Sequence, residues 1–499
     1  MIKKIFGPPG SGKTTFLLKT IEEEINRGVT PSRIGYFAFT RRASTEAKDR
    51  ACLKFGFSDQ DLSWFRTLHS LAYKCLSLSS NQIISQQDYK EFSVRVGIKI
   101  SDEKTEDDFL VKTDNIVLNE INLARIRNSD LRQHYNQSDI NVEWHFFEYI
   151  ERAYRNFKEE KNIYDFTDIL EEVAKNPELI PSLETVIVDE AQDLSRLQWN
   201  IVKLLADKAK TTYIAGDDDQ AIYVWAGADV NSFLDLSGDV KVLSQSYRVP
   251  QSVHTLANKI ITRVQKRQEK EWSPKEEKGE VEILNDYLNL NLAKNDWLFL
   301  ASTNHLLNPL HDWLKSQGIL FERNGQSSIP SVILNSVLGW ESLRSGKKVN
   351  FETLKNIYKY LDSSFVKRGH KSLKEADKSI LYSLKDLKEN HGLLTEKIWH
   401  EALTKISQEK RSYIVALLRR KVKLKDTANV RLSTIHGSKG TESDNVVLLT
   451  DLSTRFTEEL VRRKDNMRRL LYVGVTRTKK KLHLILPENH NKSLMELLC

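Results

Sequence analysis

The sequence predicts an α/β protein with two parallel-sheet domains, each interrupted by a mainly helical insertion. Short runs of apolar and β-branched residues alternate with helical patterns in two separate parts of the chain, which is typical of parallel sheets. Within each part the alternation stops over a long stretch, and polar segments with helical periodicity replace it. The length of 499 residues is sufficient for about three ordinary domains.

The first alternating region opens with an expected strand at Ile2–Phe6 and an expected helix at Thr14–Ile25. Further strands are expected at Ile34–Phe39, Thr185–Asp189, Thr211–Ala215 and Val240–Leu243. Between them, the stretch EWHFFEYIERAYRNF has aromatic residues at helical spacing, which favours a buried core over a ligand site. We therefore expect a first sheet domain at 1–85 and 176–245, with a helical insertion at 86–175.

The second alternating region follows Val249 and contains six strand-like runs. These are VEILND, DWLFLAST, GILFER, VRLSTIH, NVVLLTD and KLHLILP. A Lys-rich helical stretch without a strand signal separates the first three runs from the last three. We expect a second sheet domain at 246–330 and 428–499, with a helical insertion at 331–427.

The charge of the chain permits a polyanionic partner without requiring one. Lys and Arg number 76 against 68 Asp and Glu, a surplus of eight. Basic runs crowd the C-terminal fifth, at Arg419–Lys425, Arg462–Arg469 and Arg477–Lys481. A single run of this kind is usually a solvated face.

The cysteines and the hydropathy of the chain argue against a secreted or membrane protein. Cys52, Cys75 and Cys499 form no C-x-x-C pair, so neither a disulfide framework nor a zinc site is indicated. No apolar run approaches the roughly 18 to 20 residues that cross a bilayer, and MIKKIFGPPG lacks the apolar segment of a signal peptide. We expect a cytoplasmic or nucleoid-associated protein, or one of the host cytoplasm if it is viral, with no membrane partner.

The stretch GPPGSGKT matches the phosphate-binding pattern G-x-x-x-x-G-K-[ST] between the first strand and the first helix. Glycines there let backbone N–H groups face phosphate oxygens at the positive end of the helix. Lys13 is expected to reach the β- and γ-phosphates, and the Thr14 hydroxyl to hold Mg²⁺. The residues expected at the phosphates are Gly7, Pro8, Pro9, Gly10, Ser11, Gly12, Lys13, Thr14 and Thr15.

A second motif, TVIVDEAQD, supplies carboxylates at the end of an expected strand. Ligands of open α/β sheets bind at the carboxyl ends of strands. Asp189 is expected to order the water shell of Mg²⁺, and Glu190 to polarise the attacking water. A helix cap is the structural alternative for such a pair, and the preceding phosphate loop disfavours it.

With these motifs, the chain resembles the superfamily 1A DNA helicases, the group of UvrD, Rep and PcrA. VDEAQD resembles motif II, and IAGDDDQAIYVWAGA resembles motif III. The remaining matches are YFAFTRRA to motif Ia, FRTLHS to Ib, LSQSYRVP to IV, LSTIHGSKGTES to V and RRLLYVGVTRTKKKLHL to VI. The resemblance spans nearly the whole chain and implies two RecA-like domains with insertions resembling subdomains 1B and 2B.

The resemblance implies roles in ATP hydrolysis for residues outside the phosphate loop. Gln220 would sense the γ-phosphate, and Arg248 and Arg477 would be arginine fingers, whose guanidinium forks suit charge on the transferred phosphoryl group. Tyr247 would stack on the base. Glu442 would contact the ribose, although its neighbours Thr441 and Ser443 depart from the large apolar residues usual there.

The resemblance also implies a path for single-stranded DNA. Tyr223 and Trp225 would hold unstacked bases at about 1–3 kcal/mol each. The other positions associated with the strand are Thr40, Arg41, Thr67, His69, His436 and Lys439. A packed core residue is the alternative for each histidine, and RNA is an alternative substrate because the contacts are to backbone and ring faces.

The resemblance implies an ATP-dependent 3′–5′ helicase and translocase that needs ATP and Mg²⁺ and acts on single strands and duplex junctions. We expect a monomer in the absence of partners, and a protein loading partner or complex is compatible with it. The alternative is a DNA-stimulated ATPase that remodels or binds DNA within a larger repair, replication or defence complex without unwinding. The family's 2B insertion is much longer than this one, which keeps that alternative open. Only six residues precede Gly7, where the family has a glutamine segment that recognises adenine, so we expect relaxed nucleotide choice.

Overall fold

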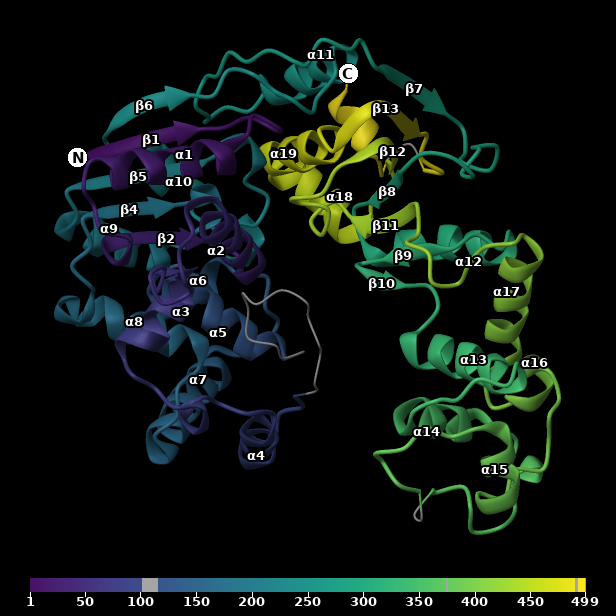
Figure 1. The fold of residues 1–499 in the computed structure, drawn as a ribbon. Coiled ribbons are helices and arrows are strands. Elements are labelled where there is room, and N and C mark those ends of the chain that lie inside the picture. The colour runs from purple at the N-terminus through teal and green to yellow at the C-terminus, as the bar shows by residue number, and fades with distance from the viewer. Residues whose placement is uncertain (101–114, 374–375, 490–491, 499) are drawn as a thin grey trace. The chain divides into compact units, whose positions relative to one another are not determined.

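The computed structural model describes residues 1–100, 115–373, 376–489 and 492–498. It confirms the predicted α/β class, with two sheets and many helices (Figure 1). Contacts between Cα atoms divide the chain into two compact units. Unit 1 comprises 1–280, 458–477 and 497–499, and unit 2 comprises 281–457 and 478–496.

The sheet of unit 1 has six parallel strands in the order β3-β2-β4-β5-β1-β6. The strands are β1 Ile2–Phe6, β2 Ile34–Ala38, β3 Phe65–Thr67, β4 Thr185–Val188, β5 Thr211–Gly216 and β6 Asp239–Val242. The five predicted strands are confirmed within one or two residues at their ends. Strand β3, which has only three residues, was not predicted.

Helices cover both faces of this sheet. On one face lie α1 Lys13–Asn26 and α2 Arg41–Phe55, and on the other lie α3 Leu68–Cys75, α9 Arg196–Lys208 and α10 Val230–Leu234. Helices α11 Gln251–Ile261 and α19 Lys464–Val475 pack on each other. Apolar residues Leu17, Leu18 and Ile21 of α1 share one helix face and are buried against one side of the sheet. Trp199 of α9 is buried in the core on the other side. The strands β1, β4 and β5 are therefore held by packed cores on both faces of the sheet, and this fixes the positions of their carboxyl ends.

The described part of the stretch from 86 to 175 is mainly helical. Its helices are α4 Gln86–Val96, α5 Ile116–Ile126, α6 Leu131–Gln137, α7 Trp144–Lys161 and α8 Phe166–Lys175. Phe147, Tyr154 and Phe157 of α7 are buried, which confirms the expected core stripe. Phe146 and Tyr149 of the same helix are exposed.

The sheet of unit 2 has seven strands in the order β10-β9-β11-β8-β12-β13-β7. The strands are β7 Glu280–Leu284, β8 Trp297–Ala301, β9 Phe321–Arg323, β10 Gln326–Ser327, β11 Val430–Thr434, β12 Ser443–Leu449 and β13 Thr478–Ile485. Strands β9, β11, β8, β12 and β13 run parallel, and β10 pairs antiparallel with β9. The six predicted runs are all strands. Helix α12 Asn308–Ser316 lies between β8 and β9 in the sequence, and α18 Thr454–Arg462 follows β12.

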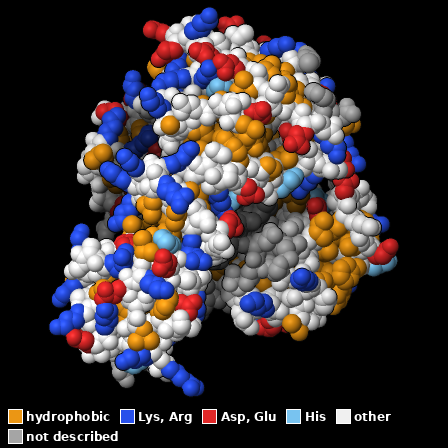
Figure 2. All heavy atoms as spheres, turned by 90° about the vertical axis from the view of Figure 1, so that its right-hand side faces the viewer, with side chains coloured by type: hydrophobic (Ala, Val, Ile, Leu, Met, Phe, Trp, Pro, Cys, Tyr) orange, Lys and Arg blue, Asp and Glu red, His pale blue; other side chains and the backbone are white. Residues whose placement is uncertain are grey.

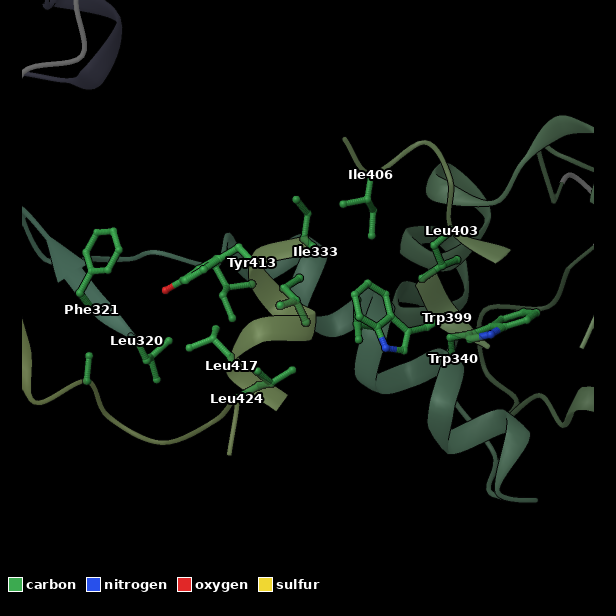
Figure 3. Close-up of a cluster of buried hydrophobic side chains, with 14 of the residues drawn as sticks. Leu320, Phe321, Ile333, Trp340, Trp399, Leu403, Ile406, Tyr413, Leu417 and Leu424 are labelled. Atoms are coloured by element: carbon green, nitrogen blue, oxygen red, sulfur yellow. The ribbon is translucent and has the colours of Figure 1, made fainter. Parts of the chain in front are cut away.

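The insertion from 331 to 427 is built from helices. They are α13 Ser331–Arg344, α14 Phe351–Tyr360, α15 Leu384–Asn390, α16 Trp399–Ala402 and α17 Gln408–Arg419. Its buried residues form one core with the sheet of unit 2. Figure 3 shows Phe321 of β9 beside Tyr413 of α17, with Leu417 next along the same core and Trp340 and Trp399 deeper in the insertion. The insertion is therefore continuous with its sheet.

This insertion carries the positive surplus of the chain. It contains 21 Lys and Arg and 11 Asp and Glu, a surplus of ten against eight for the whole sequence, so the rest of the chain is slightly acidic. Lys and Arg side chains are numerous on the molecular face that Figure 2 shows. Among the described residues, no helix is long and apolar enough to cross a membrane.

Candidate nucleotide site and nucleic-acid interface

The phosphate loop connects β1 to α1, as predicted, and glycine is required at several of its positions. Gly10 and Gly12 have φ of +73° and +74°, in the left-handed region. A Cβ atom on Gly7 would lie 2.1 Å from Cγ of Lys13, which leaves no space for a side chain. The Gly7 amide donates a hydrogen bond to the carbonyl of Gly216 at the end of β5 (3.0 Å).

The donor set of this loop fits a nucleotide phosphate. The Ser11 hydroxyl is buried and has no hydrogen-bond partner within the described part of the chain. Helix α1 begins at Lys13, so its unpaired N–H groups and partial positive charge face the loop. Thr14 offers a hydroxyl in the first turn of α1, and hydroxyl and carboxylate oxygens are the ligands that Mg²⁺ prefers.

The motif II carboxylates lie directly after β4. Lys13 Nζ and Glu190 Oε1 are 3.1 Å apart, and Glu190 has left-handed backbone at φ 54°. Asp189 is buried, and its Oδ1 accepts a hydrogen bond from the Glu190 amide (2.9 Å), while its Oδ2 accepts one from the Tyr36 hydroxyl (2.8 Å). The predicted metal-ordering and water-polarising carboxylates are thus beside the predicted phosphate lysine.

Burial and charge act against each other in this cluster. Burial alone would lower the pKa of the Lys13 ammonium, but the carboxylates of Glu190 and Asp189 outweigh it and raise that pKa. Burial and the nearby Glu190 charge raise the pKa of Asp189. Lys13 therefore stays charged at neutral pH, where an anionic phosphate would meet it.

Polar side chains connect motif II to motif III and motif VI. Gln192 Nε2 donates to Glu190 Oε2 (2.6 Å), and Gln192 Oε1 accepts from the Asp217 amide (2.9 Å). Gln220 Nε2 donates to Asp217 Oδ2 (2.7 Å). Arg477 Nη2 donates to Gln220 Oε1 (2.7 Å). We call this set the polar chain; its members are Lys13, Glu190, Gln192, Asp217, Gln220 and Arg477.

The motif IV segment braces the phosphate loop. The Ser246 hydroxyl donates to the Pro9 carbonyl (2.7 Å), and the Tyr247 amide donates to the Gly10 carbonyl (2.9 Å). A Cβ atom on Gly10 would lie 2.3 Å from Cβ of Arg248, and one on Gly12 would lie 4.0 Å from Cε2 of Tyr247. The predicted second arginine finger and the predicted base-stacking ring are therefore at the loop, and the ring of Tyr247 is 75% exposed.

Two functional candidates near motif III were missed by the sequence reasoning. Lys270 is fully buried, with its Nζ 3.0 Å from Asp217 Oδ1 and 2.8 Å from Asp219 Oδ2, and it also contacts Asp218. Arg267 donates two hydrogen bonds to Asp219 (2.8 and 2.6 Å). These three carboxylates lie close enough to hold an ion in principle, but the Lys270 ammonium lies among them. Three consecutive aspartates after an apolar strand were the available signal, because buried carboxylates need cations.

The predicted DNA-binding aromatics of unit 1 line one apolar pocket. It is lined by Tyr223 and Trp225, which flank the start of a short 3₁₀ helix at Val224–Ala226, by His69 of α3 and by Phe39 after β2. The Phe39 and Tyr223 ring centroids are 5.6 Å apart, and those of Tyr223 and Trp225 are 6.5 Å apart. Phe39 was interpreted as a strand residue in the sequence, so its place in this pocket was missed.

Arg41, Thr67 and His69 share a neighbouring cavity of about 790 Å³. Arg66 also lines it, and so does Phe166 of α8, whose ring centroid lies 6.1 Å from that of His69. Phe166 was also missed. It is the first residue of α8, and nothing in the linear pattern places it beside motif Ib.

Thr40 and Thr67 have a visible structural task. Thr40 Oγ1 accepts from the Ala43 amide (3.0 Å) and caps α2, and Thr67 Oγ1 accepts from the Ser70 amide (3.2 Å) and caps α3. Both hydroxyls therefore fix the N-termini of helices at this surface. A role of either residue toward DNA stays a prediction.

The remaining predicted residues belong to unit 2. His436 and Lys439 lie in the turn after β11, and the His436 and Phe456 ring centroids are 6.1 Å apart. Glu442 Oε1 is 3.5 Å from Lys479 Nζ. Their predicted contacts with DNA and ribose stay predictions.

Comparisons with known proteins assign two parts of the chain to helicase family models. A family model described as the UvrD/REP helicase N-terminal domain matches residues 3–241, and one described as the UvrD-like helicase C-terminal domain matches residues 429–485. Both matches follow the order in which the motifs were found.

Curated relatives include a probable DNA helicase of Mycoplasma pneumoniae, 27% identical over an alignment of 305 residues that covers 54% of each chain. The ATP-dependent DNA helicase PcrA of Bacillus subtilis is 25% identical over an alignment of 378 residues that covers 70% of this chain and 50% of PcrA. This chain spans about half the length of these two relatives. Among solved structures, an Arterivirus nonstructural protein 10 (helicase) in complex with DNA matches 99% of this chain and 63% of its own at 11% identity and a TM-score of 0.37.

The two family models thus cover the phosphate loop and motifs Ia to III at one end and motifs V and VI at the other. In unit 1 the polar chain joins the phosphate loop, motif II and motif III to Arg477 of motif VI. The protein belongs to the UvrD-like helicases of superfamily 1A.

Proposed function

We propose that this protein is an ATP-dependent DNA helicase and translocase that moves 3′ to 5′ along single-stranded DNA and separates duplex strands. The observation that carries the proposal is the polar chain, which joins the lysine of the phosphate loop to a motif VI arginine. A phosphate loop alone fits many nucleotide-binding proteins. A side-chain link from that loop to motif III and motif VI supports a nucleotide-driven motor, and relatives named DNA helicases support the DNA substrate.

In hydrolysis, Lys13 would hold the β- and γ-phosphates, and Glu190 would accept a proton from the attacking water. Bound Mg²⁺, ordered by Thr14 and Asp189, would supply charge stabilisation at the phosphates. Gln220, Arg248 and Arg477 would contact the γ-phosphate and the charge that develops on it. Arg477 now donates to Gln220, so a bound γ-phosphate would compete for both side chains. This competition is a physical route from nucleotide state to motif III, which continues directly into Tyr223 and Trp225.

DNA would be held by rings and by basic side chains. The pocket of Phe39, Tyr223 and Trp225 suits unstacked bases, because stacking on aromatic rings is worth about 1–3 kcal/mol per base and tolerates any sequence. Arg41 and His69 line the adjoining cavity. The surplus of ten positive charges in the insertion 331–427 supports contact with duplex phosphates at a junction.

The domain boundaries are part of this proposal. The first RecA-like domain would be 1–85 and 176–245, with a 1B-like insertion at 86–175. The second would be 246–330 and 428–499, with a reduced 2B-like insertion at 331–427. Each hydrolysis cycle would change the affinity of these domains for the single-stranded DNA.

A strand-separation assay with the purified full chain tests the proposal. A duplex with a single-stranded tail and a fluorophore–quencher pair should open in the presence of ATP and Mg²⁺, and ATP turnover should rise on addition of single-stranded DNA. Lys13→Ala, which removes the phosphate contact, is the control and should do neither. DNA-stimulated hydrolysis without strand separation would instead support a remodelling or binding subunit of a larger complex.

A further inference from the structure

Tyr36 of β2 is fully buried, yet its hydroxyl reaches a carboxylate of the nucleotide site. It is the third residue of β2, its side chain has no exposed area, and its ring stacks on Phe65 of β3 at 5.4 Å. In the sheet register Tyr36 pairs with Ile187 of β4. Asp189 follows two residues later on the same side of that strand's path, because side chains alternate along a strand. The length of the phenol ring carries its hydroxyl to the Asp189 carboxylate.

That hydroxyl donates a hydrogen bond to Asp189 Oδ2 at 2.8 Å. Asp189 Oδ1 accepts from the Glu190 amide at 2.9 Å. Each oxygen of the carboxylate is thus fixed by one donor, one from a neighbouring strand and one from its own backbone. Hydrogen bonds to an ionised carboxylate stabilise its charged form and fix its orientation.

The ring and the hydroxyl of Tyr36 have separable tasks. The ring belongs to the apolar core between the sheet and α1 and α2, which a phenylalanine would fill equally well. The hydroxyl is a hydrogen-bond donor, and the acceptor that it meets is Asp189 Oδ2. The hydroxyl therefore serves Asp189 rather than the core.

We propose that Tyr36 is a positioning residue of the metal site, whose hydroxyl holds the Asp189 carboxylate in the orientation that orders the Mg²⁺ water shell. This inference rests on the proposed function, which assigns Asp189 to the metal. Partners of metal-ordering groups commonly change metal affinity by 10- to 100-fold when they are removed. Tyr36 would act in this way through a single hydrogen bond.

The test compares Tyr36→Phe with the full-length wild-type chain. Binding of Mn²⁺ to the protein–ADP complex is followed by the electron paramagnetic resonance of free Mn²⁺, and binding of fluorescent ADP is measured in EDTA. Tyr36→Phe should weaken Mn²⁺ binding by about 10-fold and leave ADP binding in EDTA unchanged. Unchanged Mn²⁺ binding in Tyr36→Phe would overturn the inference.

Tyr213→Phe is the matched control. Tyr213 lies on β5 of the same sheet and donates to a buried carboxylate, Glu24 Oε1, at 3.0 Å. Glu24 is in the last turn of α1, away from its phosphate-facing start. This variant should bind Mn²⁺ as the wild type does. Equal weakening in both variants would assign the effect to the stability of the sheet and overturn the inference.

Asp189→Asn separates this inference from the proposed function. Weak Mn²⁺ binding in Asp189→Asn with normal binding in Tyr36→Phe would overturn the role of Tyr36 alone. Normal binding in both variants would show that Asp189 does not order the metal, so the proposed assignment would fail first.

A second measurement covers the case in which Tyr36→Phe does not fold. 3-Fluorotyrosine at position 36 keeps the ring and the hydroxyl, and its ¹⁹F resonance reports on the hydrogen bond. Addition of Mg²⁺ to the ADP complex should shift this resonance, because the acceptor of the bond then also binds the metal's water. A resonance that does not move would overturn the inference.

Discussion

Glu190 shows how one strained residue can place a reactive group. Its left-handed backbone at the end of β4, a conformation that costs about 1–3 kcal/mol in a non-glycine residue, brings its carboxylate within 3.1 Å of Lys13. We predict that Glu190→Gln lowers DNA-stimulated turnover by about 10² to 10⁴, because an amide cannot accept the proton of water. Nucleotide affinity should persist, since the phosphate ligands are intact. Phosphate release and titration with fluorescent ATP measure the two effects.

Lys13→Ala should instead weaken nucleotide binding, whereas Glu190→Gln should lower only the rate of hydrolysis. The pair of variants thus separates binding from chemistry at two side chains in contact. Near-normal turnover of Glu190→Gln would remove Glu190 from the reaction and leave the contact with Lys13 as its task.

Arg477 carries the second residue-scale prediction. It is 1% exposed, and it donates to Gln220 and to the Val473 carbonyl. Arg477→Ala should lower turnover by about 10³ or more, as loss of an arginine finger does. Arg469→Ala is the matched control, because Arg469 of α19 is equally buried but donates to the backbone carbonyls of Asp218 and Lys266.

Thermal unfolding of both arginine variants corrects turnover for any loss of folded protein. A decrease in Arg477→Ala of less than about tenfold, or one matched by Arg469→Ala, would place Arg477 outside the transition state.

At the scale of elements, the apolar runs were sufficient to predict nearly all strands. A run such as TVIV can be buried on both faces only in a sheet covered by helices. Strands β3 and β10 were not predicted, because Phe65–Thr67 and Gln326–Ser327 are too short to show a period. The sequence analysis also missed the places of Phe39 and Phe166 in the pocket and the cavity. Which strand ends are neighbours depends on the order of strands in the sheet, and hydrophobic periodicity does not reveal that order. The residues of the phosphate loop and motif II were found because their types and spacing carry chemistry, whereas the other site residues were predicted from the resemblance to the helicase motifs.

The pocket of Phe39, Tyr223 and Trp225 leads to a prediction about DNA binding rather than about ATP hydrolysis. Trp225 is 37% exposed on its 3₁₀ helix. Trp225→Ala should preserve basal ATP hydrolysis and raise the DNA concentration for half-maximal stimulation by about 5- to 150-fold, which corresponds to 1–3 kcal/mol of stacking. Trp225→Phe keeps a ring and should restore most of the stimulation. Equal loss of basal and stimulated rates in Trp225→Ala would identify Trp225 as a core residue instead.

The helical insertion 331–427 and its sheet should open together, because they share one core. Leu417 of α17 is fully buried in that core, near Leu320 and Tyr413 (Figure 3). Leu417→Ala should cost about 2–5 kcal/mol and lower hydrogen-exchange protection in β11 as well as in α17. The adjacent Leu418, 43% exposed, is the control, and its alanine variant should change stability by less than about 0.5 kcal/mol. Loss of protection confined to α17 would contradict a shared core.

At the scale of the whole molecule, charge is distributed unevenly. The insertion 331–427 has a surplus of ten positive charges, whereas the other residues are slightly acidic in sum. A general attraction to DNA by the whole surface is therefore a poor explanation of binding. We therefore propose that DNA is bound at local sites, and the candidates are the aromatic pocket and the neighbouring cavity of unit 1 and the basic insertion of unit 2.

Directional movement is the property that would join these sites into the proposed motor. A chain with two different sheet domains meets the two ends of a strand differently, so one polarity must be favoured, and membership of the UvrD-like helicases supports 3′ to 5′. We predict that the isolated protein opens a duplex with a 3′ single-stranded tail at least tenfold faster than one with a 5′ tail, and that a blunt duplex stays closed. Strand separation with ATP and Mg²⁺ is followed by fluorescence at equal tail lengths, with Lys13→Ala as the inactive control. Efficient opening of only the duplex with a 5′ tail would contradict the proposed polarity and would leave the description of the ATP site unchanged.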